Sequence, residues 1–558
     1  MTSIRKGFVD VPHGQVHYRC GGRGPVVVML HDSPRSSVQH VTNIDWLGEH
    51  FTVIALDTPG YGNSTPLPRP DPEVADFAAA LGATLTALGI ERCALYGLHS
   101  GANVALQFAA DHAERVALAI LDGLALTPES ASRVYLERYL QPVDPSPDGG
   151  HLPRQWCRVL DLHRYFPWFD KSAATRLPLP LPDDLHLHEY ATDLLVAGHH
   201  WGCGYGAALR HEAIPSIPHL RSRTVFMCRE DDVNDRFLDH LPRPLPAGCS
   251  LERVPPQLPA WRTRLLELLR SAERPQAAWR PARPSSVANA RTERQHYVDL
   301  VHGQVRVRLR GNGGTPLLLL HDVPGGSTSM RALADTLGSD RLTIAPDLPG
   351  LGESHPLPFP SLGTYVTALV EMLEPLECGR VDVVAEGLGA CFAVALAAHH
   401  PGLVRRLALD GLPMVRSRHR RFFARHYCPP LAPDRHGTHL LRVWQQLRDA
   451  EASWPWFDRS AAAARRRDPD LDPGRMNASL VEVMRQLPSY GDAARAALEA
   501  AVRDILHGVQ QPVLLLHVAD DVLYSGTRRA ARHLANARLV PRPAALEERA
   551  ERLREFFA

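Results

Sequence analysis

The chain has 558 residues and carries 62 Lys or Arg against 61 Asp or Glu, a balance that argues against a nucleic-acid-binding surface. Hydrophobic residues make up 44%, enough for sizeable cores, and the nine cysteines include no C-x-x-C pair and are typical of reduced thiols. No run of about 18 apolar residues would span a membrane, and the N-terminus lacks the apolar run of a signal peptide. We therefore expect a soluble, cytoplasmic protein without a nucleic-acid or membrane partner.

Short runs of β-branched residues and leucine recur along the first half of the chain. They lie at Val26–Leu30, Thr52–Leu56, Ala94–Tyr96, Leu118–Leu121, Thr224–Met227 and Ser250–Val254. Runs that are apolar at every position are typical of strands buried on both faces. Because longer helical patterns separate them, the sequence predicts an α/β fold, with a mostly parallel sheet and helices on both faces.

The third of these runs leads into YGLHSGANV, a glycine-flanked turn before a small-residue helix. In the pattern G-x-S-x-G, a nucleophile sits midway between two glycines on a tight strand-to-helix turn. Here Gly97 and Gly101 flank His99. We therefore expect His99 at the tip of the turn, pointing into a pocket, with Ser100 beside it. A neutral imidazole takes up a proton near neutral pH, which makes His99 a candidate base or nucleophile.

Two carboxylates are candidate partners that would orient His99. Asp122 follows the neighbouring run at the same end of the sheet, and Asp232 lies in VFMCREDDVND, after the next run. Asp122 has a counterpart in the second half of the chain, where no such histidine exists, and this favours a structural role in an Asp-Gly turn. The sequence leaves the choice between the two carboxylates open.

A segment rich in Trp, His, Pro and Leu interrupts the alternation at about residues 126–218. Inserted between two strands, it would form a cap over the carboxyl ends of the sheet, where open α/β sheets bind ligands. Its stretch GHHWGCGYG has no obvious counterpart later in the chain. We expect His199, His200 and Trp201 of this stretch to face the ligand.

His31 and Asp32 lie on the loop after the first run and are expected to border the same pocket. Together with His99 and a cap histidine, these groups would be able to ligate a metal. No ligand spacing is diagnostic, however, and the sequence therefore predicts no metal and no cofactor.

The second half of the chain repeats the first. VDVPHGQVHYR recurs as VDLVHGQVRVR, VIALDTPGYGNSTPLP as TIAPDLPGLGESHPLP and FPWFDKSAA as WPWFDRSAA, at a nearly constant spacing. Such self-similarity indicates duplication of one domain. We expect a first lobe at 1–270, an exposed linker at 271–295, and a second lobe at 296–558 with its own cap at about 415–509. The two lobes are expected to pack on each other, and the oligomeric state stays open.

These segments resemble the α/β-hydrolase fold family in both copies. LHDSP is similar to the family's oxyanion-hole loop, DTPGYGNS to its D-x-x-G-x-G-x-S turn, and GLHSGA stands where its nucleophile turn stands. The resemblance implies a nucleophile on that turn, an acid after a late strand and a histidine after the last strand. In the first copy, VFMCREDDVND offers Asp231 and Asp232 at the acid position that the resemblance implies.

The chain departs from the family's pattern at two positions. Neither copy has a histidine after its last predicted strand, and in the second copy Gly387 occupies the place of the nucleophile. Glycine has no side chain to attack a substrate, so the second lobe is predicted to be non-catalytic.

Two functional hypotheses follow. In the first, the first lobe is a hydrolase-like or lyase-like enzyme that acts on a small, mostly apolar carbonyl compound. His99 would be its base or nucleophile, Asp122 or Asp232 would orient it, and amides near Asp32 and Ser100 would bind an oxyanion. In the second, the protein is a catalytically inactive relative that binds a small molecule or serves as a scaffold. The missing late histidine favours the second hypothesis, and the filled acid position favours the first.

Overall fold

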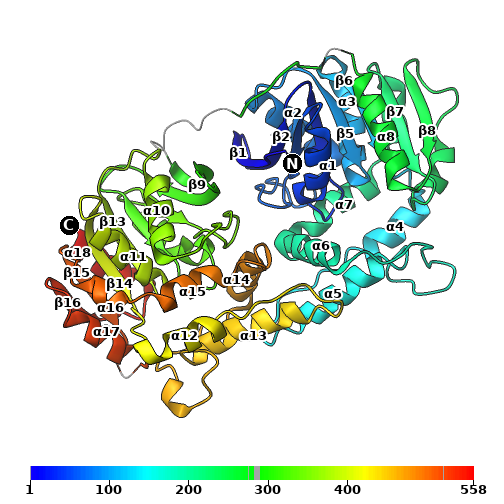
Figure 1. The fold of residues 1–558 in the computed structure, drawn as a ribbon. Coiled ribbons are helices and arrows are strands. Elements are labelled where there is room, and N and C mark those ends of the chain that lie inside the picture. The colour runs from blue at the N-terminus through cyan, green and yellow to red at the C-terminus, as the bar shows by residue number, and fades with distance from the viewer. Residues whose placement is uncertain (1, 274, 282–289, 520) are drawn as a thin grey trace. The chain divides into compact units, whose positions relative to one another are not determined.

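The computed structural model describes residues 2–273, 275–281, 290–519 and 521–558 (Figure 1). The chain forms two compact units. Unit 1 comprises Met1–Asp144 and Pro153–Arg283, and unit 2 comprises Pro145–Leu152 and Pro284–Ala558. Each unit contains an eight-stranded sheet.

The sheet of unit 1 has the strand order β1-β2-β4-β3-β5-β6-β7-β8. Its strands are β1 (Arg5–Val11), β2 (Gly14–Gly22), β3 (Val26–Leu30), β4 (Thr52–Leu56), β5 (Cys93–Leu98), β6 (Val116–Asp122), β7 (Thr224–Arg229) and β8 (Cys249–Val254). All six strands predicted from apolar runs are confirmed. The first two strands were not predicted. Strand β1 buries little of its surface, β1 and β2 are antiparallel to each other, and β2 is antiparallel to β4. Antiparallel strands need not be apolar at every position, so a search for continuous apolar runs does not find them.

Helices cover both faces of this sheet (Figure 1). On one face, α1 (Val41–Leu47) and α8 (Leu258–Arg270) bury apolar side chains against β3, β4 and β6. On the other face, α2 (Val74–Ala87) and α3 (Ser100–Asp111) pack against alternate residues of the same strands. Because successive strand residues point to opposite faces, the continuous apolar runs serve both layers.

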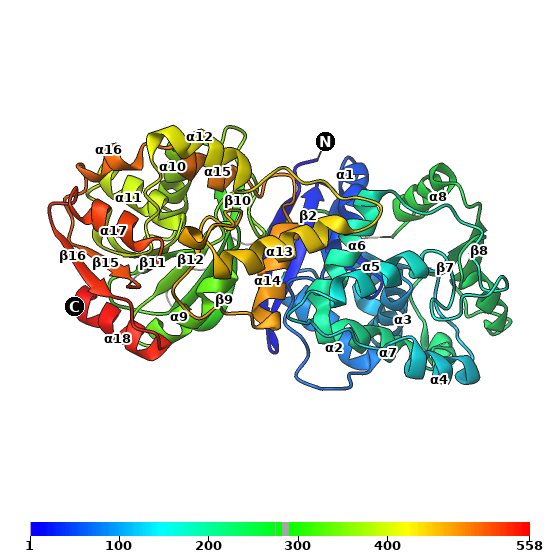
Figure 2. The same ribbon diagram turned by 90° about the horizontal axis from the view of Figure 1, so that it is seen from below.

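A cap of helices lies between β6 and β7 and can be followed in Figure 2. It consists of α4 (Glu129–Arg138), α5 (His151–Leu162), α6 (Asp184–Ala197), the short 3-10 turn η3 (Gly198–His200), α7 (Trp201–Arg210) and the 3-10 turn η4 (Ile214–His219). The helices follow the carboxyl end of β6, so the cap is attached at the edge of the sheet where ligands bind in open α/β folds.

Unit 2 repeats this architecture, with the order β16-β15-β14-β13-β11-β12-β10-β9 read from the opposite edge. Its strands are β9 (Ala290–Leu300), β10 (Gly303–Gly311), β11 (Leu317–Leu320), β12 (Thr343–Pro346), β13 (Val381–Glu386), β14 (Val404–Asp410), β15 (Val513–His517) and β16 (Ala537–Pro541). The sheet-covering helices include α9 (Arg331–Leu337), α10 (Leu362–Leu373), α11 (Gly389–His399), α17 (Tyr524–Ala531) and α18 (Leu546–Phe557). The second cap holds α12 (Ser417–His426), α13 (Thr438–Ala452), α14 (Pro473–Met484), α15 (Asp492–Glu499) and α16 (Val502–Leu506). The repeated strand order confirms two lobes of one fold.

The segment expected to be an exposed linker is structured at both ends, so that expectation is wrong there. The Gln276 backbone bonds to Val26 and Arg92, at 2.9 and 2.8 Å, and the indole of Trp279 is buried and donates to the Leu88 carbonyl at 2.6 Å. At the other end, β9 begins at Ala290. Residues 274 and 282–289 lie outside the described part. Gln276 and Trp279 hold this end of the segment, and the surrounding Pro and Arg residues obscure that signal in the sequence.

The remaining global expectations concern thiols and membrane spans. All nine cysteines are free thiols, as the composition predicted. No helix in the described ranges is long and apolar enough to cross a membrane.

Candidate active site

A cavity of about 310 Å³ lies in unit 1 between the carboxyl ends of the strands and the cap. Its floor contains Asp32 after β3, His99 after β5 and Asp232 after β7. Its walls are mostly apolar and aromatic and come from α4, α6, α7 and the loop after α5. A mostly apolar hollow with a few convergent polar groups is the usual form of a small-molecule site.

His99 stands at the tip of the turn between β5 and α3, where the sequence places it. Its backbone has φ 48° and ψ −109°, a conformation that non-glycine residues rarely adopt. A Cβ at Gly97 would lie 2.4 Å from the Gly101 carbonyl oxygen, and one at Gly101 would lie 2.6 Å from the His31 carbonyl oxygen. Only glycine fits at both flanking positions, which is why this register is the one that forms.

The imidazole of His99 is paired with Asp232. His99 Nε2 lies 2.8 Å from Asp232 Oδ2, and the Asn234 amide donates to Asp232 Oδ1 at 2.8 Å. Burial lowers the pKa of His99, but Asp232 and, more weakly, Asp32 outweigh it and raise that pKa to about 9. At neutral pH His99 is therefore an imidazolium that donates to Asp232, with 30% of its side chain still exposed.

Asp122 is not the partner of His99, which corrects the first alternative. Its carboxylate accepts from Tyr96 Oη at 2.8 Å and from Trp261 Nε1 at 2.7 Å, under the sheet and beside α8. Burial raises the pKa of Asp122 to about 6 although both donors lower it. Among the residues that the structure describes, no turn amide donates to this side chain either. Asp122 is the last residue of β6 and points to the α8 face, whereas Asp232 lies in the loop after the neighbouring strand β7 and borders the capped cavity.

The hydroxyl of Ser100 is bonded to the Ser33 amide, one of the amides near Asp32 that we expected to bind an oxyanion. The Ser33 amide donates to Ser100 Oγ at 2.7 Å, and Ser100 Oγ is 3.0 Å from Ser33 Oγ. The Asp32 amide is also taken, by Gln39 Oε1 at 3.1 Å. An oxyanion hole needs donors aimed at the developing charge. The expectation of free amides near Asp32 is therefore wrong.

His31 has a structural role. Its Nδ1 donates to the Asp32 carbonyl at 2.8 Å and its Nε2 accepts from the Thr58 amide at 3.0 Å, with the ring buried. The equivalent His321 makes the same two kinds of contact in unit 2. His31 therefore ties two loops together and does not border the cavity, whereas the Asp32 side chain does.

The cap stretch GHHWGCGYG contributes to the cavity, but through a different residue from those expected. His199 and His200 are exposed on the turn η3, and Trp201 is buried with its carbonyl accepting from Tyr61. None of the three lines the cavity, so this prediction is wrong. Tyr205, one helical turn beyond Trp201, does line it. The sequence did not show which face of α7 points inward.

The described residues contain no group of three or more His, Cys, Asp or Glu side chains placed to hold a metal ion. His31 turns its ring nitrogens to the backbone, and His199 lies on the surface with its Nδ1 3.6 Å from Asp144. The considered set of His31, Asp32, His99 and a cap histidine therefore does not converge.

The family model described as "alpha/beta hydrolase fold" matches residues 25–142 and again residues 315–431. Both lobes belong to the alpha/beta hydrolase fold family. The matched parts carry β3 to β6 and β11 to β14, the loop after the first parallel strand and the tip of the nucleophile turn in each lobe.

Several hydrolases are similar to parts of this alpha/beta hydrolase fold protein. The 2-hydroxymuconate semialdehyde hydrolase of Pseudomonas sp. strain CF600 is 34% identical over 122 residues, which cover 20% of this chain and 42% of that protein. The fluoroacetate dehalogenase of a Burkholderia species is 32% identical over 124 residues, covering 21% and 41%. A solved hydrolase from Pseudomonas aeruginosa PA01 covers 47% of this chain and 95% of its own, with 21% identity and a TM-score of 0.37. The chain spans less than half the length of these two curated relatives, so their activities do not define its own.

In the second lobe of this alpha/beta hydrolase fold protein, the side chain of Asp322 occupies the space beside Gly387, at the nucleophile position. Gly387 has φ 52°, and a Cβ there would lie 2.1 Å from Asp322 Cγ. Asp322 Oδ1 accepts from the Val323 amide at 2.8 Å and from the Leu388 amide at 2.7 Å. These amides correspond to those of Ser33 and Ser100. A fixed carboxylate therefore occupies the place where an acyl group would react.

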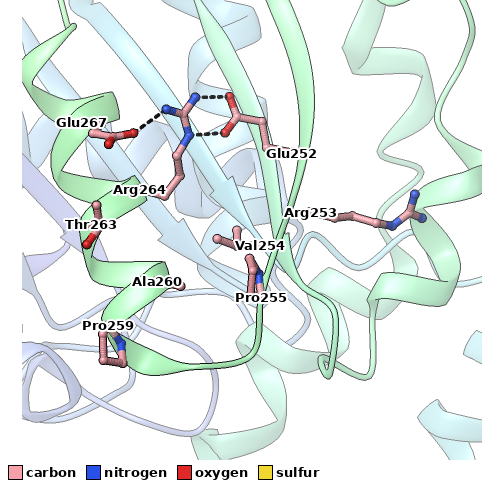
Figure 3. A pocket seen from close by; sticks show the side chains of 9 residues that line it. All are labelled: Glu252, Arg253, Val254, Pro255, Pro259, Ala260, Thr263, Arg264 and Glu267. Atoms are coloured by element: carbon pink, nitrogen blue, oxygen red, sulfur yellow. Dashed lines mark hydrogen bonds and ion pairs between the residues drawn. The ribbon is translucent and has the colours of Figure 1, made fainter.

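The place of the family's late histidine in the first lobe is the loop after β8. Val254 and Pro255 border a hollow of about 500 Å³ there, between β8 and α8 (Figure 3). Arg264 spans it with two bonds to Glu252, of 2.6 and 2.7 Å, and one of 2.8 Å to Glu267. Both carboxylates are thus bonded to Arg264, and the described lining of this hollow contains no histidine. The cavity beside His99 is therefore the candidate site.

Proposed function

We propose that the first lobe binds a small, mostly apolar molecule in its capped cavity without acyl transfer, so that the protein is a hydrolase-fold binding protein. One observation carries this proposal: His99 stands in the nucleophile's place and itself contacts the acid, at 2.8 Å. Hydrolysis by this family's chemistry needs a nucleophile and a separate base. Here one side chain fills both positions.

The protonation of His99 supports the same reading. With a pKa of about 9, only about one molecule in a hundred has a neutral imidazole at pH 7. A general base works best when its pKa is near the operating pH. The Ser33 amide, bonded to Ser100 Oγ, gives a developing oxyanion one donor fewer.

The cavity supports binding of a small molecule. Its volume of about 310 Å³ is at the lower end of the usual range for ligand sites. The relatives' printed names refer to 2-hydroxymuconate semialdehyde and fluoroacetate, which are small molecules. A small ligand is therefore consistent with both the cavity and the family.

A second candidate is favoured by the exposed part of His99. An imidazolium held by a carboxylate at the floor of a cavity is able to donate a proton to a carbonyl oxygen. This arrangement would suit a lyase-like reaction on a small carbonyl compound. It requires no covalent intermediate and hence no separate nucleophile.

The two candidates separate in one experiment. The full chain is incubated with a panel of small apolar carbonyl compounds, while melting temperature and product formation by mass spectrometry are followed. Binding without chemistry predicts a raised melting temperature and no product. Product that disappears in His99→Ala, but persists in the exposed control His199→Ala, would replace the binding proposal with the second candidate.

A further inference from the structure

The charges that border the cavity do not balance. Arg229 is bonded to Asp231 through both carboxylate oxygens, at 2.9 and 2.6 Å, and His99 is bonded to Asp232. Asp32 is the charged group that remains among the residues that line the cavity. Because each of the two cations already faces its own carboxylate, the cavity carries a net negative charge whether His99 is protonated or not.

The carboxylate of Asp32 accepts no hydrogen bond from any residue that the structure describes, and its Oδ1 is sealed from solvent. Its twin in the second lobe, Asp322, has two backbone amides on one oxygen. In the first lobe Ser100 Oγ has taken the equivalent Ser33 amide. A partly buried carboxylate without donors costs free energy that a cation or donor would offset.

Aromatic rings form much of the wall of the cavity that this carboxylate borders. Tyr139 and Tyr205 stack with centroids 4.9 Å apart, and Phe166 lies 6.2 Å from Tyr139. Burial raises the pKa of Tyr139 and of Tyr205, and the charge of Asp32 adds to it, so these phenols stay neutral. Neutral aromatic faces attract cations.

One further cation acts on this region. Burial lowers the pKa of Arg35, but the charges of Asp193 and Asp32 raise it, and the buried guanidinium is bonded to Asp193 at 2.8 Å. It lies 5.1 Å from the centroid of Tyr190, another ring of the cavity wall. Arg35 does not border the cavity, and its guanidinium is bonded to Asp193 and not to Asp32, so Arg35 supplies Asp32 with charge but with no hydrogen bond.

We propose that the ligand of the first-lobe cavity is a small organic cation, an amine with an apolar body, whose ammonium group pairs with Asp32 and lies against the tyrosine rings. This inference rests on the proposed binding function and names its ligand class. No bond is made or broken. The apolar body fills the remaining cavity, and the ammonium supplies the donors that Asp32 lacks.

The test compares three probes of one shape: cyclohexylmethylamine, cyclohexylmethanol and cyclohexanecarboxylate. Affinities for the full chain are measured by calorimetry at neutral pH. We expect the amine to bind at least about tenfold more tightly than the alcohol, and the carboxylate to bind most weakly. Asp32→Asn keeps the shape and loses no hydrogen bond, and should bring the amine to within about threefold of the alcohol.

The chain offers a matched control. Asp322→Asn makes the same change in the second lobe and should leave the preference for the amine intact. A second variant, Tyr205→Leu, removes an aromatic face and should weaken the amine several-fold more than the alcohol. Circular dichroism of each variant checks that it is folded.

The outcomes distinguish the inference from the proposed function. Equal affinity for amine and alcohol, or an amine preference that survives Asp32→Asn, overturns the inference while binding of the alcohol still supports a small-molecule site. Absence of binding by all three probes counts against both. Conversion of a probe to product contradicts the binding-only function and leaves the charge preference standing.

Discussion

His99 takes its properties from the carboxylate beside it. The contact with Asp232 holds the ring in place, and the surrounding acids keep it charged despite burial. A histidine on this turn in water would titrate near 6.5. In the folded protein the pKa of His99 is raised to about 9, and this difference can be measured on the single residue.

The first prediction concerns this titration. In nuclear magnetic resonance spectra, the ring signals of His99 should titrate near pH 9, and Asp232→Asn should move the midpoint down by more than one pH unit, because the largest favourable charge is removed. Asp122→Asn is the control, since it leaves the bond between His99 and Asp232 in place. A His99 midpoint at or below 6.5 in the wild type would contradict this account.

The same pair predicts how stability depends on pH. The pKa of His99 is raised in the folded state. The contribution of His99 to the free energy of unfolding is therefore complete below about pH 6.5 and is lost as the pH rises through about 9. The unfolding free energy of the wild type, minus that of His99→Asn, should therefore fall over this interval. Urea unfolding at several pH values measures it. A difference that grew with pH would have the wrong sign.

At the scale of the element, the strand-to-helix turns of the two lobes share a backbone conformation but differ in their side chains. His99 and Gly387 have φ values of 48° and 52°. In the first lobe the turn carries the His99 side chain and the Ser100 hydroxyl. In the second lobe, Gly387 leaves space for the Asp322 carboxyl. The shared backbone comes from the fold, and the side chains decide whether the turn opens on a cavity or on a carboxylate.

The glycine in the second turn is required by its neighbour. Gly387→Ala should lower the free energy of unfolding by about 2 kcal/mol or more, because the new Cβ would meet the Asp322 carboxyl at a positive φ. Gly402→Ala is the control, because a Cβ there meets nothing within 4 Å. Adding Asp322→Ala to Gly387→Ala should cost less than the two single changes together. A loss below about 0.5 kcal/mol for Gly387→Ala would refute the close approach.

The first turn predicts the response to serine-directed probes. Ser100 Oγ accepts from the Ser33 amide and contacts the Ser33 hydroxyl, and no histidine in the described part of the chain is bonded to it. A fluorophosphonate should therefore not label the protein, as judged by intact-mass spectrometry before and after incubation. Stoichiometric labelling that disappears in Ser100→Ala would restore an ordinary serine mechanism.

At the scale of the whole molecule, the two units are copies of one fold, but they do not divide the chain at the point where the sequence repeats. Pro145–Leu152, from within the first cap, belongs to unit 2. There the ring of His151 meets Trp444 edge-on with centroids 4.8 Å apart, and both side chains are buried. The boundary between the units therefore does not follow the boundary between the duplicated sequences.

This placement predicts which unit responds to a change in the first cap. His151→Ala should destabilise unit 2 by about 1 kcal/mol, because it removes a buried aromatic contact of Trp444. Hydrogen exchange followed by mass spectrometry should then be faster over α13. The exposed His199→Ala, from the same cap, should leave that exchange unchanged. Faster exchange confined to unit 1 would show that His151 supports the first lobe instead.

The sequence by itself determined the duplicated fold, the six parallel strands of the first lobe, the place of His99 between two glycines and the absence of a late histidine. These follow from local signals: continuous apolar runs, glycines at a close approach and residue types at fixed offsets. Only the tertiary structure decided that Asp232 and not Asp122 holds His99, that Ser100 takes the Ser33 amide, and that Tyr205 lines the cavity instead of His199 and His200. Each of these depends on which way a side chain points from a strand end or helix face, and that direction is set by packing between segments far apart in the chain.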